Sequence, residues 1–223
     1  MKFQNILALG TVVFLLAAGP GIGSASDPQS SQNPAASRYY MHAKLEVAVS
    51  DFPAEGLILD IGGGGEGVIG QLKGRQVVAI DLLKRELEEA PGSPLLKIVM
   101  DARDLKFLDA VFPTATVFFT FMYINPADHG QVFKELFRVL QPGGRLLIWD
   151  AIFPEKAGEG KTAVSYPLHI KLPKKEINTG YGVRFAEGQG SAHFVQAAEA
   201  AGFQVVSVKD ESGWFYLELK KPA

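Results

Sequence analysis

A glycine-dense turn after an apolar run is the most informative chemical feature of this sequence. Residues 57–67 read LILDIGGGGEG, so the run ends at Asp60 and the turn follows at once. Glycine lets the backbone bend tightly and approach a ligand, because a Cβ atom would block both. The helix expected next offers free backbone N–H groups at its start. The segment therefore predicts a site for a small molecule that carries a nucleoside.

A second acid stands at the spacing expected of a ribose-binding carboxylate. The short β-branched run at residues 76–80 ends in Asp81, about 20 residues after Asp60. In dinucleotide-binding folds a carboxylate at this place binds ribose hydroxyl groups. The alternative is an acid that caps a helix or lies in solvent at the end of a strand. Because the glycine turn precedes Asp81, we expect ribose contact.

Alternating strands and helices are expected to bring these groups together. Apolar, β-branched runs at residues 57–60, 76–80, 95–100, 116–121 and 145–149 alternate with helical patterns at residues 66–72, 84–90 and 125–140. This alternation predicts a mainly parallel sheet with helices on both faces. Asp60, Asp81 and Asp101 each close a strand, so we expect them at the carboxyl edge of the sheet, beside the glycine turn.

Two polar residues follow the fourth predicted strand, where a ligand would be reached. For Asn125 we prefer the interpretation as a helix cap, because Pro126 and Asp128 follow in the first turn. Tyr123 is open between packing in the core and lining the site.

The flanking segments are expected to complete the domain. Residues 165–172 and 177–185 are two extended runs that predict a hairpin. Such a hairpin either covers the pocket, with His169 as a base, or lies on the surface with an ordinary histidine, and we favour the second interpretation.

Three further elements are predicted from hydrophobic patterns and helix caps. Residues 38–49 are expected to be helical. Residues 191–201 are also expected to be helical, with Ser191 as the N-cap. The last strands are expected at residues 204–208 and 214–220.

Composition excludes several classes of function. The chain has 22 basic and 24 acidic residues and a net charge of −2, so no electrostatic footprint for nucleic acid is present. It has no cysteine, which excludes disulfides and thiol ligands. The four histidines lie at residues 42, 129, 169 and 193, without the spacing of metal ligands, so we expect no metal site.

The first residues have the three-part layout of a secretory signal peptide. Lys2 precedes an apolar stretch at residues 6–18, and small residues follow at 23–26. The stretch is shorter than the ~20 residues of a membrane-spanning helix, although an uncleaved anchor remains an alternative. We therefore expect residues 1–26 to direct export to the periplasm or the exterior, or to anchor the chain at a membrane. A start codon further downstream would leave the protein in the cytoplasm.

A flexible linker is expected between this leader and a single domain. Residues 27–36 are rich in Ser, Gln, Asn and Pro, which predicts a linker. The domain is then expected to occupy residues 37–223, with no internal repeat.

Four segments together resemble the class I S-adenosylmethionine-dependent methyltransferases, most closely the small-molecule type 11 group. They read DIGGG from Asp60, AID up to Asp81, MDARDLKF at residues 100–107 and KELFRVLQPGGR at residues 134–145. The resemblance extends over residues 57–150. It implies a Rossmann-like, doubly wound α/β fold with a mainly parallel, seven-stranded sheet that ends in an antiparallel C-terminal strand pair.

The resemblance implies S-adenosylmethionine as the cofactor and gives each segment a role. The glycine turn takes the methionine moiety and Asp81 takes the two ribose hydroxyls. The Asp101 side chain takes the adenine amino group, and the Ala102 backbone takes an adenine ring nitrogen. The implied cofactor-binding residues are Asp60, Gly62, Gly63, Gly64, Asp81, Leu82, Asp101, Ala102 and Thr120.

Glu66 departs from the D-x-G-x-G-x-G pattern of the resembled family. It stands at the third glycine position, with Gly65 and Gly67 on either side. Either the turn is rearranged by one residue, or the Glu66 side chain points outward. An anionic side chain that faced the ligand's carboxylate would repel it, so we expect the outward orientation.

The expected reaction is methyl transfer to a small-molecule acceptor. Displacement at a sulfonium methyl group mainly requires a close, dry acceptor, and a base only if the acceptor must lose a proton. Tyr123 and His169 are the catalytic candidates, and no metal is expected. One alternative is a non-catalytic protein that binds S-adenosylmethionine, because export would separate the enzyme from a cytoplasmic methyl donor. An NAD(P)-dependent oxidoreductase is a weaker alternative, because it leaves Asp101 unexplained. The oligomeric state is not predicted.

Overall fold

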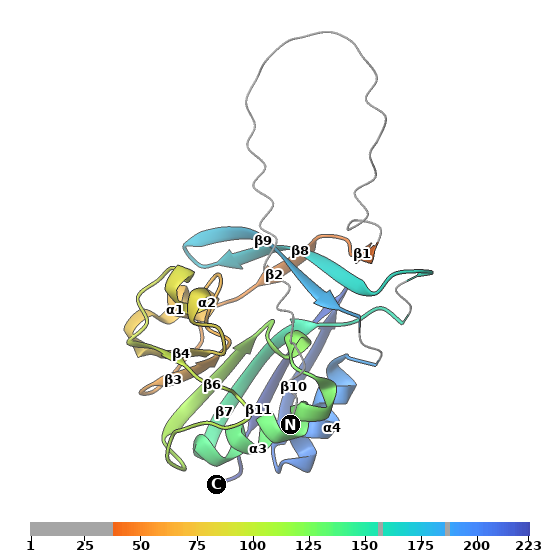
Figure 1. Ribbon diagram of the computed structural model, residues 1–223. Coiled ribbons are helices and arrows are strands. Elements are labelled where there is room, and N and C mark those ends of the chain that lie inside the picture. The colour runs from red at the N-terminus through yellow and green to blue at the C-terminus, as the bar shows by residue number, and fades with distance from the viewer. Residues whose placement is uncertain (1–37, 156–157, 186–187) are drawn as a thin grey trace, which may run out of the picture. The chain divides into compact units, whose positions relative to one another are not determined.

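The computed structural model describes residues 38–155, 158–185 and 188–223 (Figure 1). The expected leader at 1–26 and linker at 27–36 lie outside the described residues. The described chain divides into two compact units. We call them the hairpin unit, with described residues 38–49, 155 and 158–185, and the sheet unit, with described residues 50–154 and 188–223.

The sheet unit is built on seven strands, most of them parallel. The strands are β3 (Ile58–Ile61), β4 (Val77–Asp81), β5 (Leu96–Val99), β6 (Phe112–Phe118), β7 (Leu140–Ala151), β10 (Gln204–Glu211) and β11 (Trp214–Lys220). Their order is β10-β11-β7-β6-β3-β4-β5, and only the pairs β10–β11 and β11–β7 are antiparallel. The predicted sheet with its antiparallel C-terminal pair is confirmed.

The strand order reverses between β3 and β6. From β3 the chain moves outward to β4 and β5, and then returns to β6 and β7 on the other side of β3. In open α/β sheets, ligands bind beyond the carboxyl ends of the strands at such a switch point. The glycine turn directly follows β3, so the topology places it at this point.

The helices lie where the alternating pattern predicts them. They are α1 (Val68–Lys73), α2 (Lys84–Glu89), α3 (His129–Val139) and α4 (Ser191–Ala200), with short 3-10 turns η2 (Gly74–Gln76), η3 (Phe121–Tyr123) and η4 (Pro126–Asp128). Helix α1 packs against β4 and β6, and α2 packs against β4 and β5. Helices α3 and α4 lie side by side and contact each other (Figure 1). In the described part of the chain, no helix is long and apolar enough to span a membrane.

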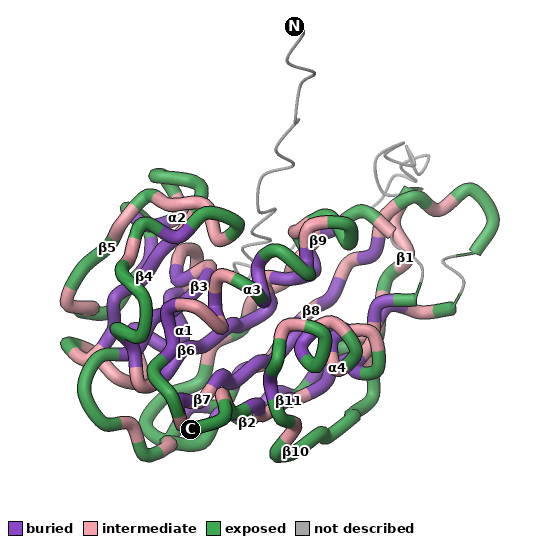
Figure 2. The backbone as a smooth tube through the Cα atoms, turned by 90° about the horizontal axis from the view of Figure 1, so that it is seen from below, coloured by how far each residue is buried: buried purple, intermediate pink, exposed green. Residues whose placement is uncertain are grey.

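One face of the sheet supplies the main hydrophobic core. Successive side chains of a strand point to opposite faces, so alternate residues reach this core. Among its fully buried members are Leu59, Ile80, Val117, Ile148 and Leu217 of the strands, Phe133 and Leu136 of α3, and Phe194 of α4. Figure 2 shows the buried central strands and the exposed strand β10 at the sheet edge. Each fully buried side chain of this size contributes roughly 1.5–3 kcal/mol.

The hairpin unit confirms the predicted hairpin. Strands β8 (Ala163–Leu172) and β9 (Lys175–Arg184) pair antiparallel along their whole length. Strand β1 (Tyr39–Met41) pairs with the first part of β8, and β2 (Leu45–Ala48) pairs with its second part, both parallel.

The helix predicted at residues 38–49 is wrong, because this segment forms β1 and β2. Leu45, Val47 and Val49 are buried, whereas Glu46 between them is exposed. This period of two fits a strand, and β-branched valine favours it. The helical spacing of Tyr40, Leu45 and Val49, on which the prediction of a helix depended, was a weaker signal than this alternation.

Several boundaries also differ from prediction. Strand β7 extends from Leu140 to Ala151 rather than over residues 145–149, and β10 extends to Glu211 rather than to residue 208. Strand β6 begins at Phe112 and ends at Phe118, so it starts and stops earlier than the predicted residues 116–121. Ser191 is not the cap of α4, since Gly190 holds that position. The Ser191 hydroxyl donates instead to Asp210 Oδ2 at 2.9 Å, which ties α4 to β10.

Candidate functional site

The glycine turn is packed so tightly that side chains are excluded from it. Gly62 has a φ of 70°, and a Cβ there would lie 2.1 Å from Thr120 Oγ1. A Cβ on Gly63 would lie 2.7 Å from Asp60 Oδ2, and one on Gly64 would lie 2.7 Å from Asp81 Oδ2. The backbone of the turn therefore lies directly against both carboxylates.

Glu66 lies between two glycines with left-handed backbones. Gly65 has a φ of 55° and Gly67 a φ of 52°. The Gly67 N–H donates to Gly64 O at 2.9 Å, which closes the turn before α1. The bends thus fall at Gly65 and Gly67, whereas Gly63 and Gly64 provide the close approach. Because Gly65 and Gly67 supply the bends, the position between them tolerates the side chain of Glu66. The outward direction of that side chain stays a prediction.

Asp60 is buried with a neutral partner. Its side chain in β3 is 2% exposed, and Oδ1 accepts a hydrogen bond from Thr116 Oγ1 at 2.7 Å. Burial raises the pKa of Asp60 to about 7, with a further increase from the charge of Asp81 that the Thr116 hydrogen bond opposes. A cationic group brought to this place would favour the ionised form.

Asp81 ends β4 beside the glycine turn. The Leu83 N–H donates to Asp81 Oδ1 at 2.9 Å. Burial raises the pKa of Asp81, against the effect of backbone N–H groups that include that of Gly64. The predicted convergence of Asp60, Asp81 and the turn is present in the structure. Leu82, the next residue, is 58% exposed, so its side chain is open to contact.

Glu86 is a third carboxylate at this place and was not predicted. It lies in the first turn of α2, and its Oε2 is 3.6 Å from the position of a Cβ on Gly65. Partial burial raises the pKa of Glu86, and the charge of Asp81 raises it further. In the sequence, an acid in the first turn of a helix is explained by its favourable interaction with the helix dipole. The sequence therefore offered no reason to expect Glu86 beside the glycine turn.

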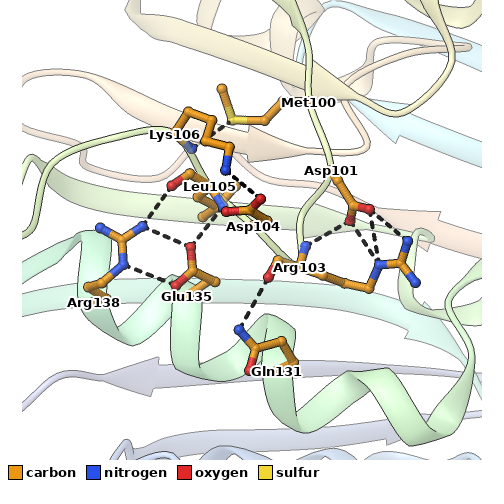
Figure 3. Close-up of polar contacts among 9 residues, drawn as sticks. All are labelled: Met100, Asp101, Arg103, Asp104, Leu105, Lys106, Gln131, Glu135 and Arg138. Atoms are coloured by element: carbon orange, nitrogen blue, oxygen red, sulfur yellow. Dashed lines mark hydrogen bonds and ion pairs between the residues drawn. The ribbon is translucent and has the colours of Figure 1, made fainter.

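Asp101 follows β5 and is held by Arg103 (Figure 3). Arg103 makes four hydrogen bonds to it, from its backbone N at 2.9 Å, from Nε to the two carboxylate oxygens at 3.0 and 3.1 Å, and from Nη2 at 2.7 Å. These contacts hold the pKa of Asp101 below its usual range. The Met100 N–H donates to Asp81 O at 2.9 Å, so Asp81 and Asp101 end neighbouring strands. Ala102 packs partly buried against the core.

A buried aspartate holds the chain where it leaves β6. Asp150 in β7 accepts from the backbone N–H groups of Thr120 at 3.0 Å, Phe121 at 2.8 Å and Met122 at 3.2 Å. Burial raises the pKa of Asp150 to about 7, and these N–H groups oppose the increase. Phe119 just before them has a φ of 46°, a strained conformation for a non-glycine residue. The turn thus directs Thr120 toward Gly62.

The catalytic candidates lie in different units. Tyr123 is 51% exposed in η3, so it is not a core residue. Asn125 caps η4, where its Oδ1 accepts from the Ala127 N–H at 3.0 Å, as predicted. His169 belongs to the hairpin unit, where its ring nitrogens contact Glu46 at 2.8 Å and Glu176 at 3.1 Å. Its role as a base stays a prediction.

The chain is similar to known methyltransferases. A family described as "Methyltransferase domain" matches residues 59–148, from β3 into β7. The ubiquinone/menaquinone biosynthesis C-methyltransferase UbiE of Desulfotalea psychrophila is 32% identical over 164 residues, which are 64% of this chain and 63% of that protein. The chain spans 63%, 29% and 41% of the lengths of the first three curated relatives that it matches.

Solved structures agree on the fold. Phosphoethanolamine N-methyltransferase 2 of Haemonchus contortus, in complex with S-adenosyl-L-methionine, matches with a TM-score of 0.56 at 15% identity, over 78% of this chain and 50% of that one. The [4+2]-cyclase SpnF matches with a TM-score of 0.55 at 16% identity, over 76% of each chain. Because the two names describe different reactions, the fold by itself does not decide the chemistry.

Proposed function

We propose that this chain, which belongs to the class I S-adenosylmethionine-dependent methyltransferases, transfers the methyl group of S-adenosylmethionine to a small-molecule acceptor. The observation that carries the proposal is the convergence of three strand ends. Asp60, Asp81 and the glycine turn between them lie in contact at the carboxyl ends of β3 and β4, and Asp101 ends the adjacent strand.

The residues present fit each part of the cofactor. Gly62, Gly63 and Gly64 are packed against Thr120, Asp60 and Asp81, where a Cβ would collide, and the bare backbone placed beside the two carboxylates suits the methionine moiety. The Asp81 carboxylate suits two ribose hydroxyl donors. Asp101 and the Ala102 backbone suit the adenine edge. Leu82 and Thr120 complete the set, as an exposed apolar contact and a hydroxyl beside the turn.

The buried carboxylates favour a cationic ligand over a neutral one. S-adenosylmethionine supplies an activated methyl group on a positively charged sulfur. The charge of Asp81 raises the pKa of Asp60 and that of Glu86, so a nearby positive charge relieves this repulsion. Electrostatics at the turn therefore support this class of ligand.

The acceptor side is expected at the end of β6. Asp150 fixes the backbone from Thr120 to Met122, and Tyr123, which follows, is 51% exposed. Holding the acceptor in line and excluding water supplies much of the rate in such a transfer. The name of the Desulfotalea psychrophila relative makes a hydroquinone ring the first acceptor to test.

The place of action is a separate proposal about the segment outside the described residues. Its support is the charged, apolar and small-residue layout of residues 1–26, followed by the Ser- and Pro-containing residues 27–36. We propose that this leader exports the chain or anchors it at a membrane, ahead of a domain at residues 37–223. Mass spectrometry of cell fractions, reading the N-terminal residue and the compartment, tests it. An intact Met1 in the soluble cytoplasmic fraction would contradict it.

A turnover experiment distinguishes catalysis from binding. The full-length chain is incubated with S-adenosylmethionine carrying a deuterated methyl group, together with demethylated hydroquinones and a small-molecule cell extract. We expect S-adenosylhomocysteine and a product that gains the labelled methyl group, and both to form roughly 30-fold more slowly with Asp81→Ala when S-adenosylmethionine is below saturation, the ratio that about 2 kcal/mol of lost affinity gives. A folded chain that binds S-adenosylhomocysteine but forms no labelled product above the Asp81→Ala background would favour the non-catalytic binding protein. Binding of NADH, seen as a change in its fluorescence, would favour the oxidoreductase.

A further inference from the structure

Four polar residues form a stripe along α3 and the turn before it. Asp128, Gln131, Glu135 and Arg138 are spaced by three or four positions, which places them on one side of a helix. Each of them contacts the segment between β5 and β6. We call the four residues the α3 stripe, and we call residues 101–109 the adenine loop, because they include Asp101 and Ala102.

The stripe binds the main chain of the adenine loop, which belongs to no strand (Figure 3). Gln131 Nε2 donates to Arg103 O at 3.2 Å. The Leu105 N–H donates to Glu135 Oε2 at 2.7 Å, and Arg138 Nη2 donates to Leu105 O at 2.8 Å. Main-chain groups must find partners when they are buried, so these side chains replace the missing strand neighbour.

Glu135 and Arg138 also brace each other. Arg138 donates to Glu135 through Nε at 3.0 Å and through Nη2 at 2.8 Å, a bidentate pair. The side chain of Glu135 is 14% exposed and that of Arg138 is 30% exposed, so this pair is partly shielded from solvent. Arg138 Nη1 reaches further along the loop, to Phe107 O at 2.8 Å. A planar ion pair joined by two hydrogen bonds has little freedom to rotate, so it holds the loop in one conformation.

An ion-pair chain links the stripe to Asp101. Asp128 Oδ2 accepts from Arg103 Nη1 at 2.9 Å, while Arg103 Nη2 donates to Asp101 Oδ2 at 2.7 Å. Arg103 is therefore fixed between two carboxylates, one on the helix turn and one on the loop. The orientation of the Asp101 carboxylate depends on a residue of the stripe that is 27 positions away in sequence.

We propose that the α3 stripe consists of positioning residues for adenine recognition. Its members act through the loop, by fixing the Asp101 carboxylate and the Ala102 backbone before the ligand arrives. A preorganised loop has less freedom to lose on binding, so affinity for the adenine edge rises. The inference rests on the proposed function, because it assumes that Asp101 receives the adenine amino group.

The test compares two ligands that differ only at that amino group. Calorimetry on the full-length chain measures the affinity for S-adenosylhomocysteine and for its analogue with hydrogen in place of the adenine amino group. We expect the wild type to prefer S-adenosylhomocysteine. Asp128→Asn removes the charge that holds Arg103, and we expect it to reduce this preference by about threefold to tenfold, the size of one network coupling. Affinity for the analogue should hardly change.

Matched variants separate positioning from folding. Arg138→Gln should reduce the preference more than Asp128→Asn, and Arg138→Lys should restore part of it, since lysine still donates to the loop carbonyls. Arg85→Gln breaks an exposed arginine–glutamate pair on α2 and should leave the preference unchanged. Equal losses for both ligands, or an unchanged preference in Asp128→Asn, would overturn the inference. Absence of binding of either ligand to the wild type would overturn the proposed function and this inference with it.

Discussion

Burial leaves the Asp60 carboxylate half protonated near neutral pH. Its pKa of about 7 arises because the side chain has lost water and has gained only one hydroxyl donor, Thr116. The neighbouring Asp81 adds negative potential, so an arriving cation improves the environment of both carboxylates. The ionisation state of Asp60 should therefore be coupled to binding of S-adenosylmethionine or its product, both of which carry an ammonium group.

This coupling predicts proton release on binding. At about pH 7 the free protein holds a proton on part of its Asp60 side chains, and a bound cation should lower the pKa of Asp60 and expel that proton. Titration with S-adenosylhomocysteine in two buffers of different ionisation enthalpy measures the number released. Asp60→Asn should abolish most of the release. Proton uptake, or an equal release by the variant, would contradict the role of Asp60.

Single residues of the site were predictable only where local sequence sets their position. Asp60, Asp81 and Asp101 each end an apolar run, and the carboxyl ends of parallel strands meet at one edge. Glu86 and Arg103 were missed, because their positions depend on how a helix turn and a loop fold back on the strand ends. The hydrophobic periodicity of the sequence does not indicate that these segments fold back on the strand ends.

At the scale of elements, Asp150 organises the exit from β6. Its two oxygens accept from backbone N–H groups that start η3, and these hydrogen bonds oppose the increase in pKa that burial causes. In the sequence, Asp150 directly follows the apolar run that ends at Trp149, as Asp60, Asp81 and Asp101 follow theirs. Its structural role was not visible, because its partners lie about 30 residues earlier in the chain.

Removal of this carboxylate should destabilise the sheet unit. We expect Asp150→Ala to lower the free energy of unfolding by about 3–5 kcal/mol, because it leaves several buried N–H groups without an acceptor. Asp150→Asn keeps one acceptor and should cost less. Urea denaturation measures both values. Asp104→Asn, an exposed residue paired only with Lys106, is the control and should stay within about 0.5 kcal/mol of the wild type. A loss for Asp150→Ala no larger than this control would contradict the assignment.

Helices and strands were predicted well where the hydrophobic residues follow a single pattern, either a continuous apolar run or a helical spacing. The central strands consist mainly of apolar residues, many of them β-branched, and α3 carries a clear apolar stripe, so both were identified from sequence. The segment that forms β1 and β2 was misassigned, since it is short and its partner β8 lies more than 100 residues later. Pairing that distant cannot be read from a local pattern.

At the scale of the whole molecule, two sets of buried groups give opposite pH trends. Asp60 and Asp150 have raised pKa values, so the stability they contribute is present below the unfolded pKa and is lost as the pH rises toward about 7. His129 and His193, whose rings meet at 2.9 Å between α3 and α4, have pKa values lowered by burial. Their contribution is present above about pH 6.5 and is lost as the pH falls.

The histidine pair predicts a measurable part of the acid sensitivity. Between about pH 6.5 and pH 5 the wild type should lose stability as the unfolded chain takes up protons that the folded pair resists. His193→Gln removes one titrating ring and keeps an amide donor for His129, so the loss should shrink by up to about 1 kcal/mol. Urea denaturation at both pH values measures it. Lys134→Gln, an exposed change on the same helix, should leave the loss as in the wild type. A full acid loss in His193→Gln would contradict the prediction.

The affinity of the full-length chain for S-adenosylhomocysteine, measured by calorimetry, tests the central claim most directly. The account predicts saturable binding of one ligand per chain by the wild type. It predicts weakening by about 2 kcal/mol in Asp81→Ala, through lost charge-assisted hydrogen bonds to the ribose. Lys134→Gln, an exposed change on α3, should bind like the wild type. A folded wild-type chain that gives no heat of binding, or an Asp81→Ala variant with unchanged affinity, would contradict it.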